Sequence, residues 1–140
     1  TVVAFSFSTQ AQKNKKTTPK LIVPEMVNTS FNANFSDILE KNWEKNYMGN
    51  YVAKIDDDRQ TQIAEFNKDG ILLKSIINYK TESVPENIVA AVNNDYVDAK
   101  IISTEKIMIE KMMPYYKVNI TTATNKNKTL LITEEGLITE

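Results

Sequence analysis

Three consecutive carboxylates, Asp56, Asp57 and Asp58, are the densest group of chemically active side chains in the sequence. Oxygen-rich loops of this kind can hold calcium. This segment lacks the alternating ligands, the central glycine and the terminal glutamate of an EF-hand, and it continues as Arg59-Gln60. We therefore expect a solvated acidic turn that binds no metal. If the turn has a role in function, we expect it to enter a basic pocket of a partner protein.

Catalytic side chains are scarce, because the 140 residues include no histidine and no cysteine. These absences remove the commonest general base, the thiolate nucleophile and most ligands of transition metals. A serine or threonine nucleophile would depend on a lysine or a carboxylate as its base. No nucleophile elbow, P-loop or dinucleotide-binding glycine pattern is present. We expect neither enzymatic activity nor a bound cofactor.

Two aromatic residues, Trp43 and Tyr47, are candidates for an interface, because Trp and Tyr dominate binding hot spots. They lie four residues apart on an expected strand, where they would share one face with Leu39. The alternative is packing in the core, the usual position of a lone Trp. The pattern leaves both interpretations open.

Near the other end of the chain, Tyr115 is a stronger interface candidate than Tyr116. Alternation along the expected strand places Tyr115 with Lys117 on a hydrated face and Tyr116 on the apolar face. The Met112-Met113 pair precedes this strand in an expected hairpin tip. Flexible thioethers either adapt to a partner or close the edge of a core, and both interpretations stay open.

Two short helices are expected to position these residues. Pro24 and Pro85 suit the first helical turn, and Glu25 and Glu86 complement its positive end. Apolar residues then recur every four positions, which is typical of one buried stripe on each helix. The stripes are Val23, Val27, Phe31 and Phe35 in the first helix and Val84, Ile88, Val92 and Tyr96 in the second.

Strand-like segments joined by short turns follow each helix, and such neighbours pair antiparallel. We expect Gly70 and Gly136 to take positive φ in two of the turns. Alternation predicts sheets that are apolar on the helix side and hydrated on the other. The expected strands are Ile38–Asn46, Tyr51–Asp56, Gln60–Phe66, Ile71–Tyr79, Ala99–Ile109, Tyr115–Thr122, Thr129–Thr133 and Leu137–Thr139.

The order of elements repeats within the chain, since Val84-Pro85-Glu86 matches Val23-Pro24-Glu25 and the later motifs follow in the same sequence. The fold class is therefore α+β, with one helix plus a four-stranded antiparallel sheet in tandem. We expect two layers with both helices on one face. Each half is too small to be stable alone, so residues 21–140 should form a single domain of two repeats, 21–80 and 81–140.

The N-terminal segment differs in composition from the rest of the chain. Residues 1–11 are apolar and end in small residues, and a polar, lysine-rich stretch follows. This pattern is typical of the end of a secretory signal peptide, with residues 12–20 as a mobile linker. The alternative is an edge strand formed by Val3, Phe5 and Phe7. The first interpretation predicts export to the periplasm or beyond.

An ordered set of motifs runs through the chain: Val23-Pro24, Phe31, Phe35, Trp43-Glu44, Tyr51–Ile55, Phe66–Gly70, Val84–Ile88, Tyr96, Tyr116–Val118 and Gly136–Ile138. In the order of these motifs the sequence resembles a secreted PepSY-like family of Bacteroidetes that is related to beta-lactamase-inhibitor-protein-like (BLIP-like) domains. The resemblance covers about residues 21–140 and depends on the order, because each motif alone is a helix start, a strand or a turn. It implies tandem helix-plus-four-strand repeats and a non-enzymatic role in binding or inhibiting another protein.

A protein partner in the cell envelope is therefore expected, bound through the open sheet face and the hairpin tips. The alternative is a structural component, or one that binds a small ligand, peptide or ion. A net charge of −1 gives no reason to expect nucleic acid, and no segment is apolar enough to span a bilayer. The expected contact residues are Tyr115, Lys117, Met112, Met113, Trp43, Tyr47, Asp56, Asp57 and Asp58.

Overall fold

The computed structural model describes residues 20–35, 38 and 41–139. The expected signal peptide, its edge-strand alternative and Leu39 lie outside these residues. The elements, in chain order, are α1 Glu25–Asn34, β1 Asn42–Lys45, β2 Tyr51–Asp56, β3 Gln60–Phe66, β4 Leu72–Tyr79, the 3₁₀ turn η1 Thr81–Ser83, α2 Glu86–Asp95, β5 Lys100–Ile109, β6 Tyr115–Thr121 and β7 Asn127–Thr133.

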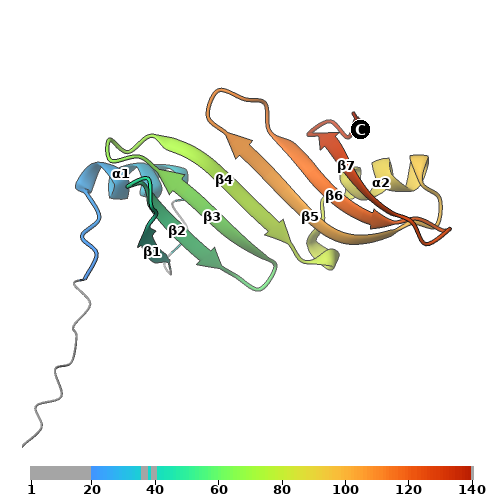
Figure 1. Ribbon diagram of the computed structural model, residues 1–140, viewed down its shortest axis with the longest axis horizontal. Coiled ribbons are helices and arrows are strands. Elements are labelled where there is room, and N and C mark those ends of the chain that lie inside the picture. Colours follow the sequence, from blue (N-terminus) through green and yellow to red (C-terminus); the bar gives the residue numbers. More distant parts are fainter. Residues whose placement is uncertain (1–19, 36–37, 39–40, 140) are drawn as a thin grey trace, which may run out of the picture.

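One continuous antiparallel sheet contains all seven strands in the order β1 to β7, with α1 near one end and α2 near the other (Figure 1). The expected pair of complete four-stranded units is not confirmed. Leu137–Thr139 makes only a single bridge, between Ile138 and Ile132. The first strand is also shorter than expected, and Ile38 instead packs against the core beneath α1.

The strand register shows that both helices lie on the same face of the sheet. Cross-strand partners point to the same side, as do residues two or four apart along one strand. Ala64, in the core beneath α1, pairs with Ser75 of β4. Four residues further along β4, Tyr79 pairs with Thr104, which pairs with Val118 in the core beneath α2. The structure therefore has two layers, one of helices and one of strands.

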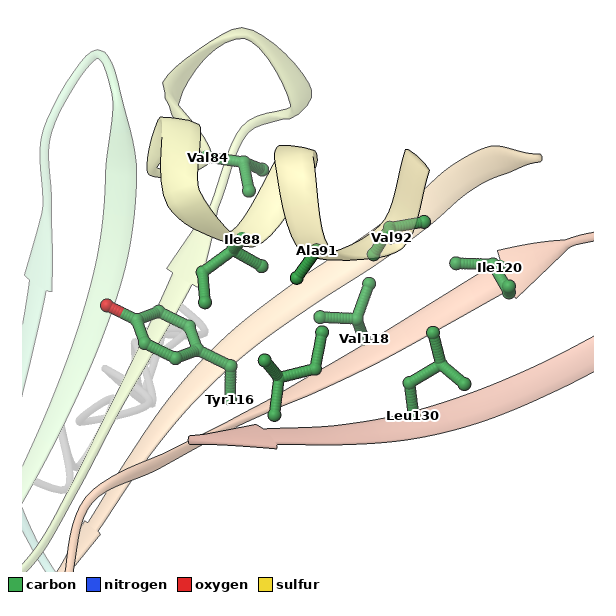
Figure 2. Packing of buried hydrophobic residues seen from close by; sticks show 9 residues of the cluster. Val84, Ile88, Ala91, Val92, Tyr116, Val118, Ile120 and Leu130 are labelled. Atoms are coloured by element: carbon green, nitrogen blue, oxygen red, sulfur yellow. The ribbon is translucent and has the colours of Figure 1, made fainter. Parts of the chain in front are cut away.

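Each helix covers its own hydrophobic cluster. Under α1, the ring of Phe31 lies 5.4 Å from Trp43 and 6.3 Å from Phe66, measured between ring centroids. Under α2, the buried side chains of the helix point down onto those of β6 and β7 (Figure 2). The β4–β5 pair joins the two clusters within one sheet.

Several turns between the strands use a side-chain acceptor at their first residue. Asn67 accepts hydrogen bonds at Oδ1 from the backbone N–H groups of Asp69 and Ile71, and Gly70 follows with φ of +83°. The expected positive φ at Gly70 is confirmed, as it is at Gly136. Gly70 also lies directly against α1, since a Cβ atom placed there would be 2.6 Å from the backbone oxygen of Met26. This turn therefore anchors β3 and β4 to the helix.

Replacing Gly70 by Ala should destabilise the protein more than replacing Gly49 by Ala. Both glycines have nearly the same positive φ, but a Cβ atom at Gly49 would meet nothing nearer than 3.9 Å. The control, Gly49→Ala, should cost about 1–2 kcal/mol in backbone strain. Gly70→Ala should cost at least about 1 kcal/mol more, because the backbone of α1 must move. Chemical denaturation of the two variants measures the difference, and equal losses would contradict the anchoring role.

Candidate interaction surface

The face of the sheet opposite the helices carries a row of apolar side chains that crosses four strands. Ile63 of β3 pairs with Ile76 of β4, which pairs with Ile107 of β5, and Ile107 pairs with Tyr115 of β6. We call Ile63, Ile76, Ile107 and Tyr115 the apolar row. The prediction of a hydrated face is therefore wrong for its centre, where aliphatic side chains predominate.

The apolar row differs in exposure along its length. Ile107 is only 9% exposed, although both helices lie on the other face of the sheet. Its neighbours on adjacent strands therefore cover it. Ile63 is 37% exposed, and Ile76 and Tyr115 are partly buried. The row is thus a packed apolar strip whose outer surface remains available for contact.

Charged residues of opposite sign flank the apolar row on both sides. Glu65 and Lys74 are cross-strand partners on one side, and Glu105 and Lys117 are partners on the other. Beyond Lys117, the Asn119 amide donates to Ser103 Oγ at 2.8 Å. The open face therefore has balanced charge and an ordered polar border. Steering by a strong field of one sign is not a feature of this surface.

The structure separates the residues that the sequence predicted as one site. Tyr115 and Lys117 lie on the open face, as expected from strand alternation. Trp43 instead pairs with Ala53 on the helix side and packs, partly buried, against the rings of Phe31 and Phe66. This position favours the core interpretation of Trp43, and its interface interpretation stays a prediction.

Tyr47 does not share a face with Trp43, because β1 ends before it and Tyr47 lies in the following turn with 96% of its surface exposed. Met112 and Met113 are in the β5–β6 turn, at the same edge of the sheet as Tyr47. The acidic turn lies at the opposite edge. There, Asp57 Oδ1 accepts hydrogen bonds from the backbone N–H groups of Arg59 and Gln60, which gives this carboxylate a structural role. Asp56 and Asp58 are exposed.

Three residues of the apolar row, Ile63, Ile76 and Ile107, were not predicted as part of a site. The adjacent pair Ile76-Ile77 is apolar at both positions, so alternation alone does not say which residue faces the helices. A signal was nevertheless present, because a strand apolar on both faces predicts burial or contact on both. A hollow of about 770 Å³ is open to solvent and lies beside β1, β2 and β3, where Lys41, Lys54 and Asp56 contribute to its wall.

On the helix side, polar groups gather between the two cores. Lys106 Nζ lies 2.7 Å from Glu134 Oε1, and the ring centroids of Tyr79 and Tyr116 are 6.3 Å apart. Burial, followed by the neighbouring phenol of Tyr116, raises the pKa of Tyr79. For Lys106, burial lowers the pKa, but the hydrogen bond to Glu134 and nearby negative charge outweigh it and leave the pKa raised. Both groups keep their protons at neutral pH, so neither acts as a general base.

Comparisons with known proteins identify the fold. No family model and no curated protein matches the chain. A BLIP-like protein from Bacteroides fragilis has a similar structure, with a TM-score of 0.68, 14% identity, and coverage of 88% of this chain and 87% of that one. A DUF2874 family protein from Bacteroides ovatus has a TM-score of 0.63, 15% identity, and coverage of 85% and 86%. A proposed periplasmic protein from Bacteroides eggerthii has a TM-score of 0.60 and 13% identity, with coverage of 85% of this chain and 87% of that one.

These similarities show a BLIP-like α+β fold. They support the BLIP-like part of the resemblance seen in the sequence and give no support to its PepSY-like part. In the part of the chain that the structure describes, no helix is both long and apolar enough to cross a membrane.

The Tyr79 and Lys106 groups should make stability depend on alkaline pH. Because the folded-state pKa of each is above its ordinary value of 10.0 or 10.5, each stabilises the protein below that value, and the contribution disappears as pH rises through the folded pKa. We expect the free energy of unfolding to fall above about pH 10. Denaturation at a series of pH values should show a smaller fall in the variant Tyr79→Phe/Lys106→Met. Identical pH profiles in the variant and the unsubstituted protein would contradict the assignment of this pH dependence to Tyr79 and Lys106.

Proposed function

We propose that this protein is an exported, non-enzymatic module that binds an envelope protein through the open face of its sheet. The observation that carries the proposal is the apolar row, a strip of aliphatic and aromatic side chains on the face that neither helix covers. An antiparallel sheet with one covered face normally presents polar side chains on the other. An apolar strip there, bordered by charged pairs, has the composition of an interface with an apolar centre and a polar rim.

The shape of the open face favours a protein over a small molecule. Four strands at about 4.8 Å spacing make the apolar row about 14 Å long. A ligand pocket would instead be concave and would enclose most of its ligand. Three hollows among the described residues are open to solvent, and of the apolar row only Ile63 lines one of them. A partner protein with an apolar ridge matches this surface better.

Inhibition of an enzyme is the more specific form of the proposal, and the BLIP-like structural neighbour supports it only through its fold. Export is supported by the description of another neighbour as a proposed periplasmic protein. The absence of histidine and cysteine supports a role without catalysis. A structural or ligand-binding envelope component is the alternative; the open hollow bordered by Lys41, Lys54 and Asp56 is where a small polar ligand would bind in that case.

Replacing Tyr115 by Ala should weaken partner binding by about 1–2 kcal/mol or more, because an aromatic side chain is lost from the end of the apolar row. Tyr115 is only partly buried, so the loss of folding stability should be about 1 kcal/mol. Tyr47→Ala is the matched control, since it also removes a tyrosine, but from a turn outside the open face. Affinity capture from the native envelope, followed by titration of the captured protein, measures both variants.

Loss of binding in Tyr47→Ala with full binding in Tyr115→Ala would exclude the open face as the site. A large loss of stability in Tyr115→Ala with unchanged affinity would assign Tyr115 to the core. The alternative function would be favoured if no protein were captured and a small envelope solute bound saturably at the hollow near Lys54.

A further inference from the structure

The turns at one edge of the sheet concentrate exposed apolar side chains. In an antiparallel sheet with sequential strands, alternate turns lie at the same edge, so the β1–β2, β3–β4 and β5–β6 turns lie together with the turn after β7. We call this the tip edge; it comprises residues 45–50, 67–71, 110–114 and 134–137. Figure 1 shows the β5–β6 hairpin projecting from it.

Six large apolar side chains at the tip edge are exposed. They come from all four turns, and the Met112-Met113 pair belongs to the projecting hairpin. The exposed fractions are 96% for Tyr47, 61% for Met48, 46% for Ile71, 57% for Met112, 78% for Met113 and 66% for Leu137. The proposed open-face site uses none of these residues.

The opposite edge has a different composition. Its β2–β3 turn is Asp57-Asp58-Arg59, and its β6–β7 turn consists of threonine, alanine, asparagine and lysine residues. Among the described residues near that edge, Val97 and Ile102 are the large apolar side chains with high exposure, at 70% and 54%. Exposed apolar surface is therefore distributed unequally between the two edges. Such an asymmetry marks a contact surface more strongly than isolated exposed residues do.

The tips are held in position by their own hydrogen bonds. Asn46 Oδ1 accepts from the backbone N–H groups of Met48 and Asn50, at 3.1 and 3.0 Å. In the turn after β7, Thr133 Oγ1 accepts from the N–H of Leu137 at 3.1 Å. These bonds hold Tyr47, Met48 and Leu137 outward, so their exposure is a property of the turn geometry.

We propose that the tip edge docks on the surface of a zwitterionic lipid bilayer. The exposed side chains belong to separate turns spread across about six strand spacings, or about 29 Å. Beneath its headgroups a bilayer offers apolar acyl chains over this whole length and needs no matching shape, whereas a protein partner would need several separate pockets. Tyrosine favours the interface between lipid and water, and methionine, leucine and isoleucine favour the acyl region.

Charge at the tip edge identifies the type of lipid. Three lysines can extend toward headgroups while their stems stay in the apolar layer. Four carboxylates offset them, so anionic lipid would give no net attraction. The lysines are Lys45, Lys68 and Lys111, and the carboxylates are Asp69, Glu110, Glu134 and Glu135. Docking therefore depends on apolar contact and persists at high salt. It is independent of the open-face function, which involves other residues.

The test is co-sedimentation of the full chain with phosphatidylcholine vesicles, compared between two variants. The tip variant is Tyr47→Ser/Met112→Ser/Met113→Ser, and the matched control is Val97→Ser/Ile102→Ser, which removes exposed apolar side chains away from the tip edge. Residues 1–19 are the same in both variants, so differences between them report the substituted positions. Thermal unfolding of each variant establishes that it is folded.

We expect the vesicle-bound fraction of the tip variant to be at least about five-fold smaller than that of the unsubstituted chain. The control should bind as the unsubstituted chain does. Binding should be unchanged in about 1 M salt, where charges more than about 3 Å apart are screened. It should also not increase when phosphatidylglycerol is added. Equal binding by the tip variant and the unsubstituted chain, or equal losses in both variants, would overturn the proposal. So would binding that requires phosphatidylglycerol, or a dimer in size-exclusion chromatography that the tip substitutions abolish.

Discussion

The pairing of β4 with β5 is the interaction on which the rest of the structure depends. It runs in register from Lys74 opposite Ile109 to Tyr79 opposite Thr104. The α1 core lies on one side of this pair and the α2 core on the other, and no buried residue that the structure describes belongs to both clusters. A helix with three or four strands buries too little apolar surface to be stable alone. Backbone pairing at β4–β5 makes the two halves a single sheet.

The same pairing creates the open face. Ile76 and Ile107, the central members of the apolar row, face each other across β4 and β5. A shift of one residue would put Lys106 or Met108 in the place of Ile107, because side chains alternate between faces. The β4–β5 register therefore determines which side chain of β5 continues the apolar row from Ile76.

Local features of the fold were predictable from the sequence because they depend on neighbouring residues. Pro24 and Pro85 mark the helix starts, and Gly70 adopts the left-handed conformation that its turn requires. The tandem four-strand units are not confirmed at the segment 137–139, where Ile138 forms one bridge rather than a strand. The repeated sequence motifs predicted equivalent elements but could not determine how many cross-strand hydrogen bonds each element would form.

The candidate site was less predictable, since it depends on contacts between distant segments. Trp43 packs against Phe31 and Phe66 on the helix side, and no local pattern specifies those neighbours. Strand alternation correctly placed Tyr115 on the open face, where its partner is Ile107. The contribution of the isoleucines to the apolar row depends on the cross-strand register. The grouping of Tyr47 with Met112 and Met113 at one edge likewise becomes visible only from the strand order.

Native-state hydrogen exchange tests the unity of residues 21–140 most directly. If the β4–β5 pair joins two dependent halves, its amides should exchange only through global unfolding, with the same free energy as amides of β3 and β6. The two halves should also lose protection at the same denaturant concentration. Exchange of the β4–β5 amides at clearly lower free energy, with protection retained in β3 and β6, would show two independent units and contradict a single continuous binding face.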